Sequence, residues 1–173
     1  ISNVLQQLAT IAIFGVANAA SVIVGKKIGE GNIKEAKSTA FSIMIMSFIA
    51  GFLASVLMFS LRKQFVSIYN ITEETRIISE NLLIITSVLV FFVSVSATSI
   101  VGVLRGAGDT KFCLKLEMIV LWFIAIPLGL AAAFIFNAPA LLTFALLKID
   151  EPIKSVIAFI RTLKDKAYRN ITR

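Results

Sequence analysis

The chain has 173 residues, of which 58% are hydrophobic and 16% charged, and its formal net charge is +7. A soluble domain carries about 25% charged residues, so this composition predicts a protein whose main solvent is lipid. The sequence holds no histidine and one cysteine, Cys113, which excludes a disulfide, a His/Cys zinc site and a Cys-His nucleophile pair within the chain. The basic residues form short clusters between uncharged runs, which argues against nucleic-acid binding. We therefore expect neither an enzyme nor a nucleic-acid-binding protein, and no metal or cofactor.

Four long stretches carry no charged residue and predict transmembrane helices. Crossing about 30 Å of hydrocarbon takes roughly 20 helical residues, and each stretch exceeds this length. Lipid leaves no partner for an unpaired backbone, and the alternation of a barrel strand is absent, so helices are the expected structure. The first stretch already begins at Ile1, without an initiator methionine, so we expect a fragment of a longer protein. The uncharged stretches are 1–25, 38–61, 81–104 and 118–147.

The last stretch is interrupted at Asn137-Ala138-Pro139, where proline disfavours a continuous helix. We therefore expect an all-α integral membrane bundle of four to five transmembrane helices, followed by a cytosolic tail. The predicted spans are about 1–25, 39–61, 81–104, 117–136 and 139–163, and the tail is 164–173.

The distribution of lysine and arginine decides between four and five spans. If 139–163 crosses the membrane, fourteen basic residues lie on one side and three on the other; if it does not, the split is seven against ten. The positive-inside rule favours a fifth span and a cytoplasmic C-terminus. The alternative is that 153–171 lies in the interface, because its apolar residues share one helical face.

Polar and small residues form a stripe on two of the predicted helices, at spacings of three and four. Asn18 is a mid-span amide that needs a partner or a water-filled cavity. Small residues and hydroxyls also let membrane helices pack closely, and this alternative applies to both stripes. The stripes are Asn3, Gln7, Thr10, Phe14, Asn18, Ser21 and Gly25 in the first helix, and Ser87, Phe91, Ser94, Thr98, Gly102 and Arg105 in the third, with Ser96 and Ser99 beside the latter.

Two connecting loops have the same form, with glycine-permitted tight turns that lead into a lysine-rich segment. They predict two helix-turn-helix connections at one membrane face. Neither loop has the spacing of a phosphate-binding loop. Their motif residues are Gly25, Gly29 and Gly31 in the first loop, and Arg105, Gly106, Gly108 and Asp109 in the second.

One charged cluster, Lys148, Asp150, Glu151 and Lys154, falls inside the predicted fifth span. The helical spacings pair Asp150 with Lys154 and Lys148 with Glu151, so the cluster is able to neutralise itself. Two interpretations stay open: a solvated helix end near the cytosolic surface, or a coupling or gating element inside the membrane.

Three signatures in this order resemble the multidrug and toxic compound extrusion (MATE) family. They are the run from Gly15 to Asn32 followed by Glu35-Ala36, the run 104–111, and the ending 168–173. The resemblance implies a two-lobe, twelve-helix antiporter in the plasma membrane that exports lipophilic or amphipathic cations in exchange for Na⁺ or H⁺. The chain would hold helices eight to twelve of its C-terminal lobe, and its partners would be the bilayer, the substrates and the missing N-terminal lobe.

The resemblance also implies a substrate cavity, for which we expect Phe14, Asn18, Phe91, Ser94 and Thr98 to form the wall. Some members place a coupling aspartate in the helix that corresponds to 81–104, but this stretch has no acidic residue. We therefore expect the coupling ion to bind in the missing lobe. One alternative is a lipid-linked saccharide flippase of the same superfamily, which predicts an intramembrane Arg or Lys that the four uncharged stretches do not supply. Another is a non-transporting, truncated membrane protein.

Overall fold

The computed structural model describes residues 2–67, 72–136, 138–164 and 167–168. Within this part every regular element is helical, which confirms the expected all-α bundle. Four helices are long and apolar enough to cross a membrane: Thr10–Gly29, Ile33–Ser67, Thr75–Leu104 and Thr110–Ile135.

The chain forms two helical hairpins and a final pair of shorter helices. The first hairpin is α1–α2, the second joins the α3–η1 rod to the α4–η3 rod, and the last pair is α6–α7. Several of the long rods contain turns of π-helix, which widen the rod without ending it. The elements are α1 (Ser2–Gly29), α2 (Ile33–Ser67), α3 (Glu73–Ala97), η1 (Thr98–Leu104), α4 (Thr110–Val120), η2 (Leu121–Ala125), α5 (Ile126–Leu130), η3 (Ala131–Ile135), α6 (Ala140–Leu147) and α7 (Asp150–Thr162).

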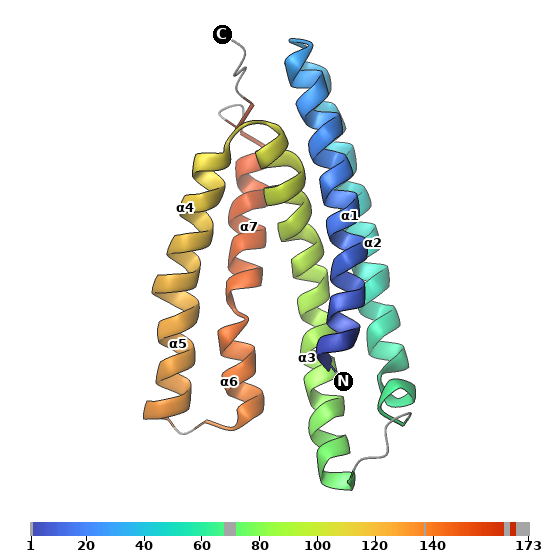
Figure 1. Cartoon of the computed structure of the whole chain (residues 1–173), viewed down its shortest axis with the longest axis vertical. Helices are drawn as coiled ribbons and strands as arrows, with labels where there is room; N and C mark the ends of the chain where they lie inside the picture. The colour runs from blue at the N-terminus through green and yellow to red at the C-terminus, as the bar shows by residue number, and fades with distance from the viewer. Residues whose placement is uncertain (1, 68–71, 137, 165–166, 169–173) are drawn as a thin grey trace.

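Helices α1, α2 and α3 pack against one another, and the α4–η3 rod lies beside the α6–α7 pair (Figure 1). Helix α7 joins the two groups because it contacts α3, η1 and α4. The α1–α2 connection, the η1–α4 connection and the end of α7 lie at one end of the bundle (Figure 1). The two loops that share a glycine pattern therefore lie on the same face, as expected for loops on one side of a membrane.

The expected span 139–163 consists of two helices in place of one. Proline 139 precedes α6, as its missing N–H allows at a helix start. Helix α6 ends at Leu147 and α7 begins at Asp150, and the two are stacked along the α4–η3 rod from one end of the bundle to the other (Figure 1). One face of α7 packs against α3, η1 and α4, and its other face is exposed; the fifth span stays a prediction. Of the predicted tail, only residues 164, 167 and 168 are among the described residues.

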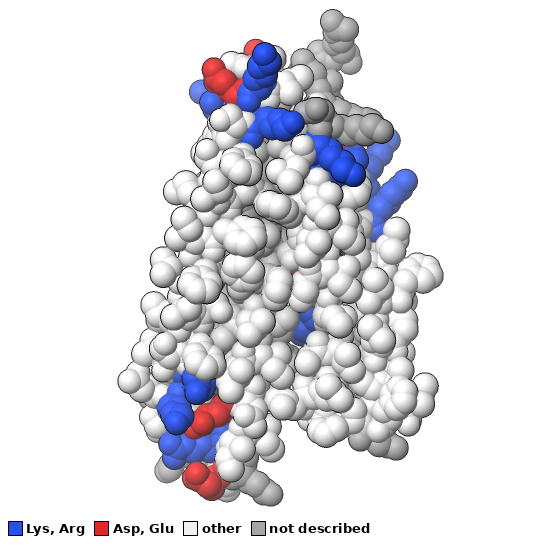
Figure 2. Space-filling model, turned by 180° about the vertical axis from the view of Figure 1, so that it is seen from behind, with Lys and Arg blue, Asp and Glu red and all other residues white. Residues whose placement is uncertain are grey.

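Charged side chains gather at the two ends of the bundle, and a broad band without them lies between (Figure 2). A small basic patch is visible within that band (Figure 2). Large apolar side chains are exposed over the band, including Trp122, Phe123 and Phe134. In water such a surface would aggregate, whereas in lipid it is solvated. The chain is therefore a multi-pass membrane protein.

Candidate functional site

A cavity of about 300 Å³ lies between α1, the α3–η1 rod, α4 and α7. We call it the polar groove, because it combines apolar walls with four charged side chains. One wall comes from α1, through Thr10 and Phe14, and the floor comes from α3 and η1. The full lining is Thr10, Phe14, Val93, Ser96, Ala97, Ile100, Val101, Arg105, Glu117, Glu151 and Lys154.

A charged network at the start of α7 occupies one side of the groove. The Lys154 ammonium lies 2.8 Å from a carboxylate oxygen of Asp150 and 3.0 Å from one of Glu151. The Ser96 hydroxyl donates a hydrogen bond of 2.8 Å to the other oxygen of Glu151. The side chains of Lys154 and Glu151 are only 15% and 19% exposed. A charge pair this buried is stable only when its partners are satisfied, and here both oxygens of Glu151 are occupied.

A second ion pair lies on the other side of the groove, where Arg105 and Glu117 approach within 3.1 Å. This pair links the end of η1 to α4 across the connecting loop. The groove therefore contains two cations and two carboxylates in its lining, and no large excess of either sign.

The floor of the groove is irregular helix. Ser96 and Ala97 end the α-helical part of α3, and the π-helix η1 begins at Thr98. Ile100 and Val101, from this π-helix, line the groove. Wide turns of this kind occur frequently at functional sites, because they present side chains that a regular helix would turn away.

The five residues expected to form a substrate wall do not come together. Phe14 lines the polar groove, whereas Asn18 is exposed on α1 and does not line it. Phe91 lines a separate cavity of about 120 Å³ on the other side of α3, where its ring lies edge-on to Phe48.

Ser94 and Thr98, the other two candidates, are 4% and 1% exposed. Both are hydrogen-bonded to the Ser47 hydroxyl of α2, which lies 3.1 Å from the Ser94 hydroxyl and 2.8 Å from that of Thr98. This cluster joins two helices in the chain itself, so the helix-packing interpretation describes these two residues. A substrate role for Phe14, Asn18 and Phe91 stays a prediction.

The two glycine loops adopt the same backbone turn. Gly31 and Gly108 have positive φ angles of 78° and 84°, and each donates a hydrogen bond to the carbonyl three residues before it. The next residues, Asn32 and Asp109, donate to the carbonyl five residues back, which completes a Schellman C-cap in both loops.

The remaining loop glycines lie within helices, where they differ in what surrounds them. A Cβ on Gly106 would meet the Ser21 backbone at 2.6 Å, and one on Gly25 would meet the Gly106 carbonyl at 3.3 Å, so both permit close packing of α1 on the η1–α4 connection. Gly29 has open space around it. Asp109 has a further role, because its carboxylate lies 2.7 Å from the Arg161 guanidinium near the end of α7.

The charged cluster is arranged partly as expected. The pairing of Asp150 with Lys154 is confirmed. Glu151, however, pairs with Lys154 in place of Lys148, which lies in the turn between α6 and α7. Among the described residues, no group of three His, Cys, Asp or Glu side chains is placed to hold a metal ion.

The sequence does not predict that residues of α1, α3, α4 and α7 line one cavity. The sequence shows Thr10 and Ser96 only as members or neighbours of polar stripes. Glu117 gave no signal, because its partner Arg105 lies across a loop, 12 residues away in sequence. Only an observed contact between α3 and α7 connects Ser96 with Glu151.

A family model described as MatE matches residues 1–137. The chain belongs to the MatE family. This confirms the resemblance given by the sequence motifs, and it agrees with a role in transport and not in enzyme catalysis. No solved structure matches the chain.

Three curated relatives carry names that refer to drug resistance or toxin extrusion. A probable multidrug resistance protein NorM of Pasteurella multocida is 27% identical over 115 residues, which are 66% of this chain and 25% of that protein. The multidrug resistance protein MdtK of Yersinia pseudotuberculosis is 24% identical over 111 residues, 64% of this chain and 24% of that protein. The multidrug and toxin extrusion protein 1 of Xenopus tropicalis is 29% identical over 123 residues, 69% of this chain and 21% of that protein. The chain thus spans about a quarter of the length of these relatives.

Proposed function

We propose that this MatE chain is part of the C-terminal lobe of a cation-coupled multidrug antiporter in the plasma membrane. The complete protein would have two six-helix lobes, and this chain would supply helices eight to twelve, with its C-terminus in the cytoplasm. Family membership, the multidrug names of two relatives and the excess of basic residues at one end support the proposal. The exported compounds would be lipophilic cations, and the coupling ion Na⁺ or H⁺.

The polar groove is the observation on which this proposal mainly rests. A bulky lipophilic cation needs apolar and aromatic contact together with a nearby negative charge. Phe14, Val93 and Ile100 supply apolar surface in the groove, and Glu117 and Glu151 supply carboxylates. We infer that the groove forms one wall of the transport path, which the part of the protein outside this chain completes.

The network at α7 suits a gate better than an ion site. Both oxygens of Glu151 are engaged, one by Lys154 and one by Ser96, so neither is open to a coupling ion. The Ser96–Glu151 hydrogen bond ties α3 to α7, next to the break between α6 and α7. Movement of α7 away from α3 would break this bond and open the groove. The coupling ion would then bind in the part of the protein outside this chain.

The flippase alternative predicts a cationic side chain in the cavity, and the groove does contain Arg105 and Lys154. Each is paired with a carboxylate, so the groove lacks the net positive charge that an anionic lipid-linked saccharide requires. The cationic side chains that the flippase alternative predicts are therefore present, but they are not available to bind an anion. In a non-transporting protein, apolar residues of similar size would stabilise this region as well as the buried charged network does, so that role does not account for the network.

Export of a fluorescent lipophilic cation by cells that express the complete protein tests the proposal. We expect Glu151→Gln to reduce export at least tenfold at equal expression, because the Lys154 charge and the tie to α3 lose their partner. The control is Glu30→Gln, which removes an exposed carboxylate 4.0 Å from Lys26 at the end of the bundle. Equal export by both variants would remove the network from the transport mechanism.

A further inference from the structure

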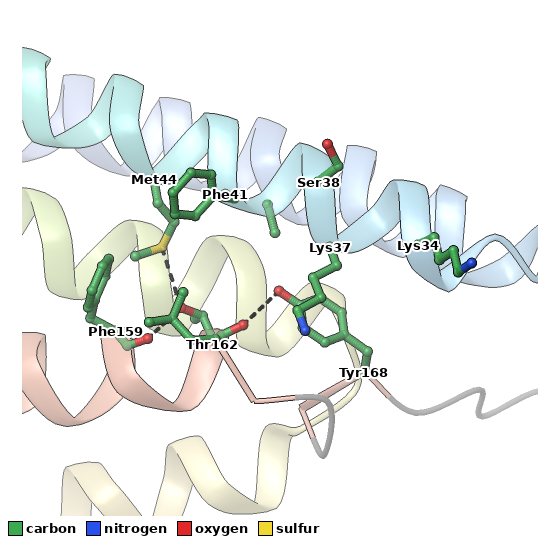
Figure 3. A pocket seen from close by; sticks show the side chains of 10 residues that line it. Lys34, Lys37, Ser38, Phe41, Met44, Phe159, Thr162 and Tyr168 are labelled. Carbon is green, nitrogen blue, oxygen red and sulfur yellow. Dashed lines mark hydrogen bonds between the residues drawn. The ribbon is translucent and has the colours of Figure 1, made fainter.

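A second cavity, of about 360 Å³, lies between the first half of α2 and the end of α7 (Figure 3). This volume falls in the range of about 300–1,000 Å³ that small-molecule sites occupy. It shares no lining residue with the polar groove. Its inner wall is apolar and includes Phe41, Met44 and Phe159, whereas Lys34 and Lys37 lie toward its other end (Figure 3).

The polarity of the cavity changes along α2 in one direction. Lys34 is in the first turn, Phe41 lies two turns further along, and Met44 lies about one turn beyond Phe41. Ten residues separate Lys34 from Met44, and at 1.5 Å per residue this is about 15 Å. That length is half of a hydrocarbon core of about 30 Å, so the cavity runs through one leaflet from its charged surface inward.

Polar groups of the inner wall are bonded within the protein. The Thr162 hydroxyl donates to the Phe159 carbonyl at 2.7 Å, and the Tyr168 hydroxyl donates to the Thr162 carbonyl at 2.9 Å (Figure 3). Among the described residues, no buried side-chain nitrogen or oxygen lacks a hydrogen-bond partner. The deep part of the cavity therefore demands an apolar occupant, because a polar one would find no partner there.

The charge at the rim is available to an anion. Within the part of the chain that the structure describes, Lys34 makes no ion pair, and the neighbouring Glu35 carboxylate is bonded to Lys27 at 3.0 Å. Lys34 also stands in the first turn of α2, where the positive end of the helix dipole favours a negative charge. An apolar tail and an anionic head, joined in that order, are the two parts of an acidic phospholipid.

We propose that this cavity binds one acyl chain of an anionic phospholipid, with the lipid phosphate beside the Lys34 ammonium. The site lies at the end of the bundle where the basic residues of the positive-inside pattern gather, and the cytoplasmic leaflet carries the acidic lipids. Because the lipid would contact both α2 and α7, it would hold the two helices together. This inference does not depend on the proposed transport activity.

Lipid retention by the purified complete protein tests the site. The protein is exchanged into mixed micelles that contain equal amounts of phosphatidylglycerol and phosphatidylcholine. The bound molecules of each lipid are then counted by native mass spectrometry. We expect phosphatidylglycerol to be retained preferentially, and Lys34→Gln to weaken its binding about fivefold, the effect of one lysine near an anionic lipid. The matched control is Lys26→Gln, which removes the same charge from the same end of the bundle, 76% exposed and away from the cavity.

A second variant separates the two parts of the lipid. Phe41 is 51% exposed, so Phe41→Ala removes cavity wall without emptying the core, and we expect it to weaken retention of both lipids. If Lys34→Gln and Lys26→Gln reduce the retention of phosphatidylglycerol equally, the lipid is attracted by the charge of the whole surface and not by a specific site. Equal retention of the two lipids by the unmodified protein would show a neutral lipid as occupant, and displacement by inorganic phosphate alone would show a soluble anion; either result overturns the proposal.

Discussion

Substitution of Gly106 by alanine should loosen the contact between α1 and the η1–α4 connection. A Cβ at this position would lie 2.6 Å from the Ser21 carbonyl oxygen and 2.9 Å from its Cα, which are backbone atoms and have no alternative rotamer. To reach an ordinary contact of 3.4 Å from that oxygen, the helices must separate by about 0.8 Å. Overpacking of this kind costs about 1–3 kcal/mol, whereas alanine gains roughly 0.5–1 kcal/mol over glycine in a helix. The expected net loss is therefore about 0–2.5 kcal/mol, with a central value near 1 kcal/mol.

Gly29→Ala is the matched control, because it makes the same chemical change in a helix where the new Cβ meets nothing within 4 Å. We expect Gly106→Ala to lower the thermal midpoint of the complete protein in detergent by about 1 °C per kcal/mol, and Gly29→Ala to leave it unchanged or raise it slightly. The fraction of protein that stays monodisperse is measured after heating to a series of temperatures, and the midpoint is the temperature at which this fraction is one half. The same shift for both variants would refute the close-packing argument.

Two further predictions concern packing and topology. Ser47→Ala should destabilise the protein by about 1–3 kcal/mol, because it leaves the buried Thr98 hydroxyl without its partner, whereas Ser94 still donates to the Ser47 carbonyl. Ser60→Ala, at an exposed position of the same helix, should have little effect in the same thermal assay. Single cysteines introduced at the two ends of the bundle should differ in their reaction with a membrane-impermeant maleimide. Glu73→Cys should react in intact cells, and Glu30→Cys only after permeabilisation. Labelling of Glu30→Cys in intact cells would reverse the orientation.

The fold was largely predictable from the sequence, because lipid imposes simple requirements on composition. The long uncharged stretches correspond to helices α1, α2, α3–η1 and α4–η3, and the interruption at 137–139 corresponds to the connection between η3 and α6. The glycine pattern predicted tight turns, although only the second glycine of each Gly-x-Gly pair, Gly31 and Gly108, has a positive φ. The first glycine stays in the helix, where a Schellman cap still needs regular backbone.

The site was less predictable, because periodicity places a residue on a helical face but does not say what covers that face. Ser94 and Thr98 share a stripe with Phe91, yet the hydroxyl of Ser47 covers them. The pairing of Lys148 with Glu151 assumed one continuous helix. Lys148 instead lies in the turn after α6, and Glu151 pairs with Lys154 within α7.

Transport by the purified complete protein tests the central claim most directly. The protein is reconstituted into liposomes that contain a fluorescent lipophilic cation, and efflux is followed while Na⁺ and pH gradients across the membrane are varied separately. We predict that one of the two gradients drives efflux, and that Glu151→Gln strongly slows this gradient-driven efflux whereas Glu30→Gln preserves its rate. Efflux that is equal in empty and protein-containing liposomes under both gradients would contradict the assignment of this bundle to a cation-coupled exporter.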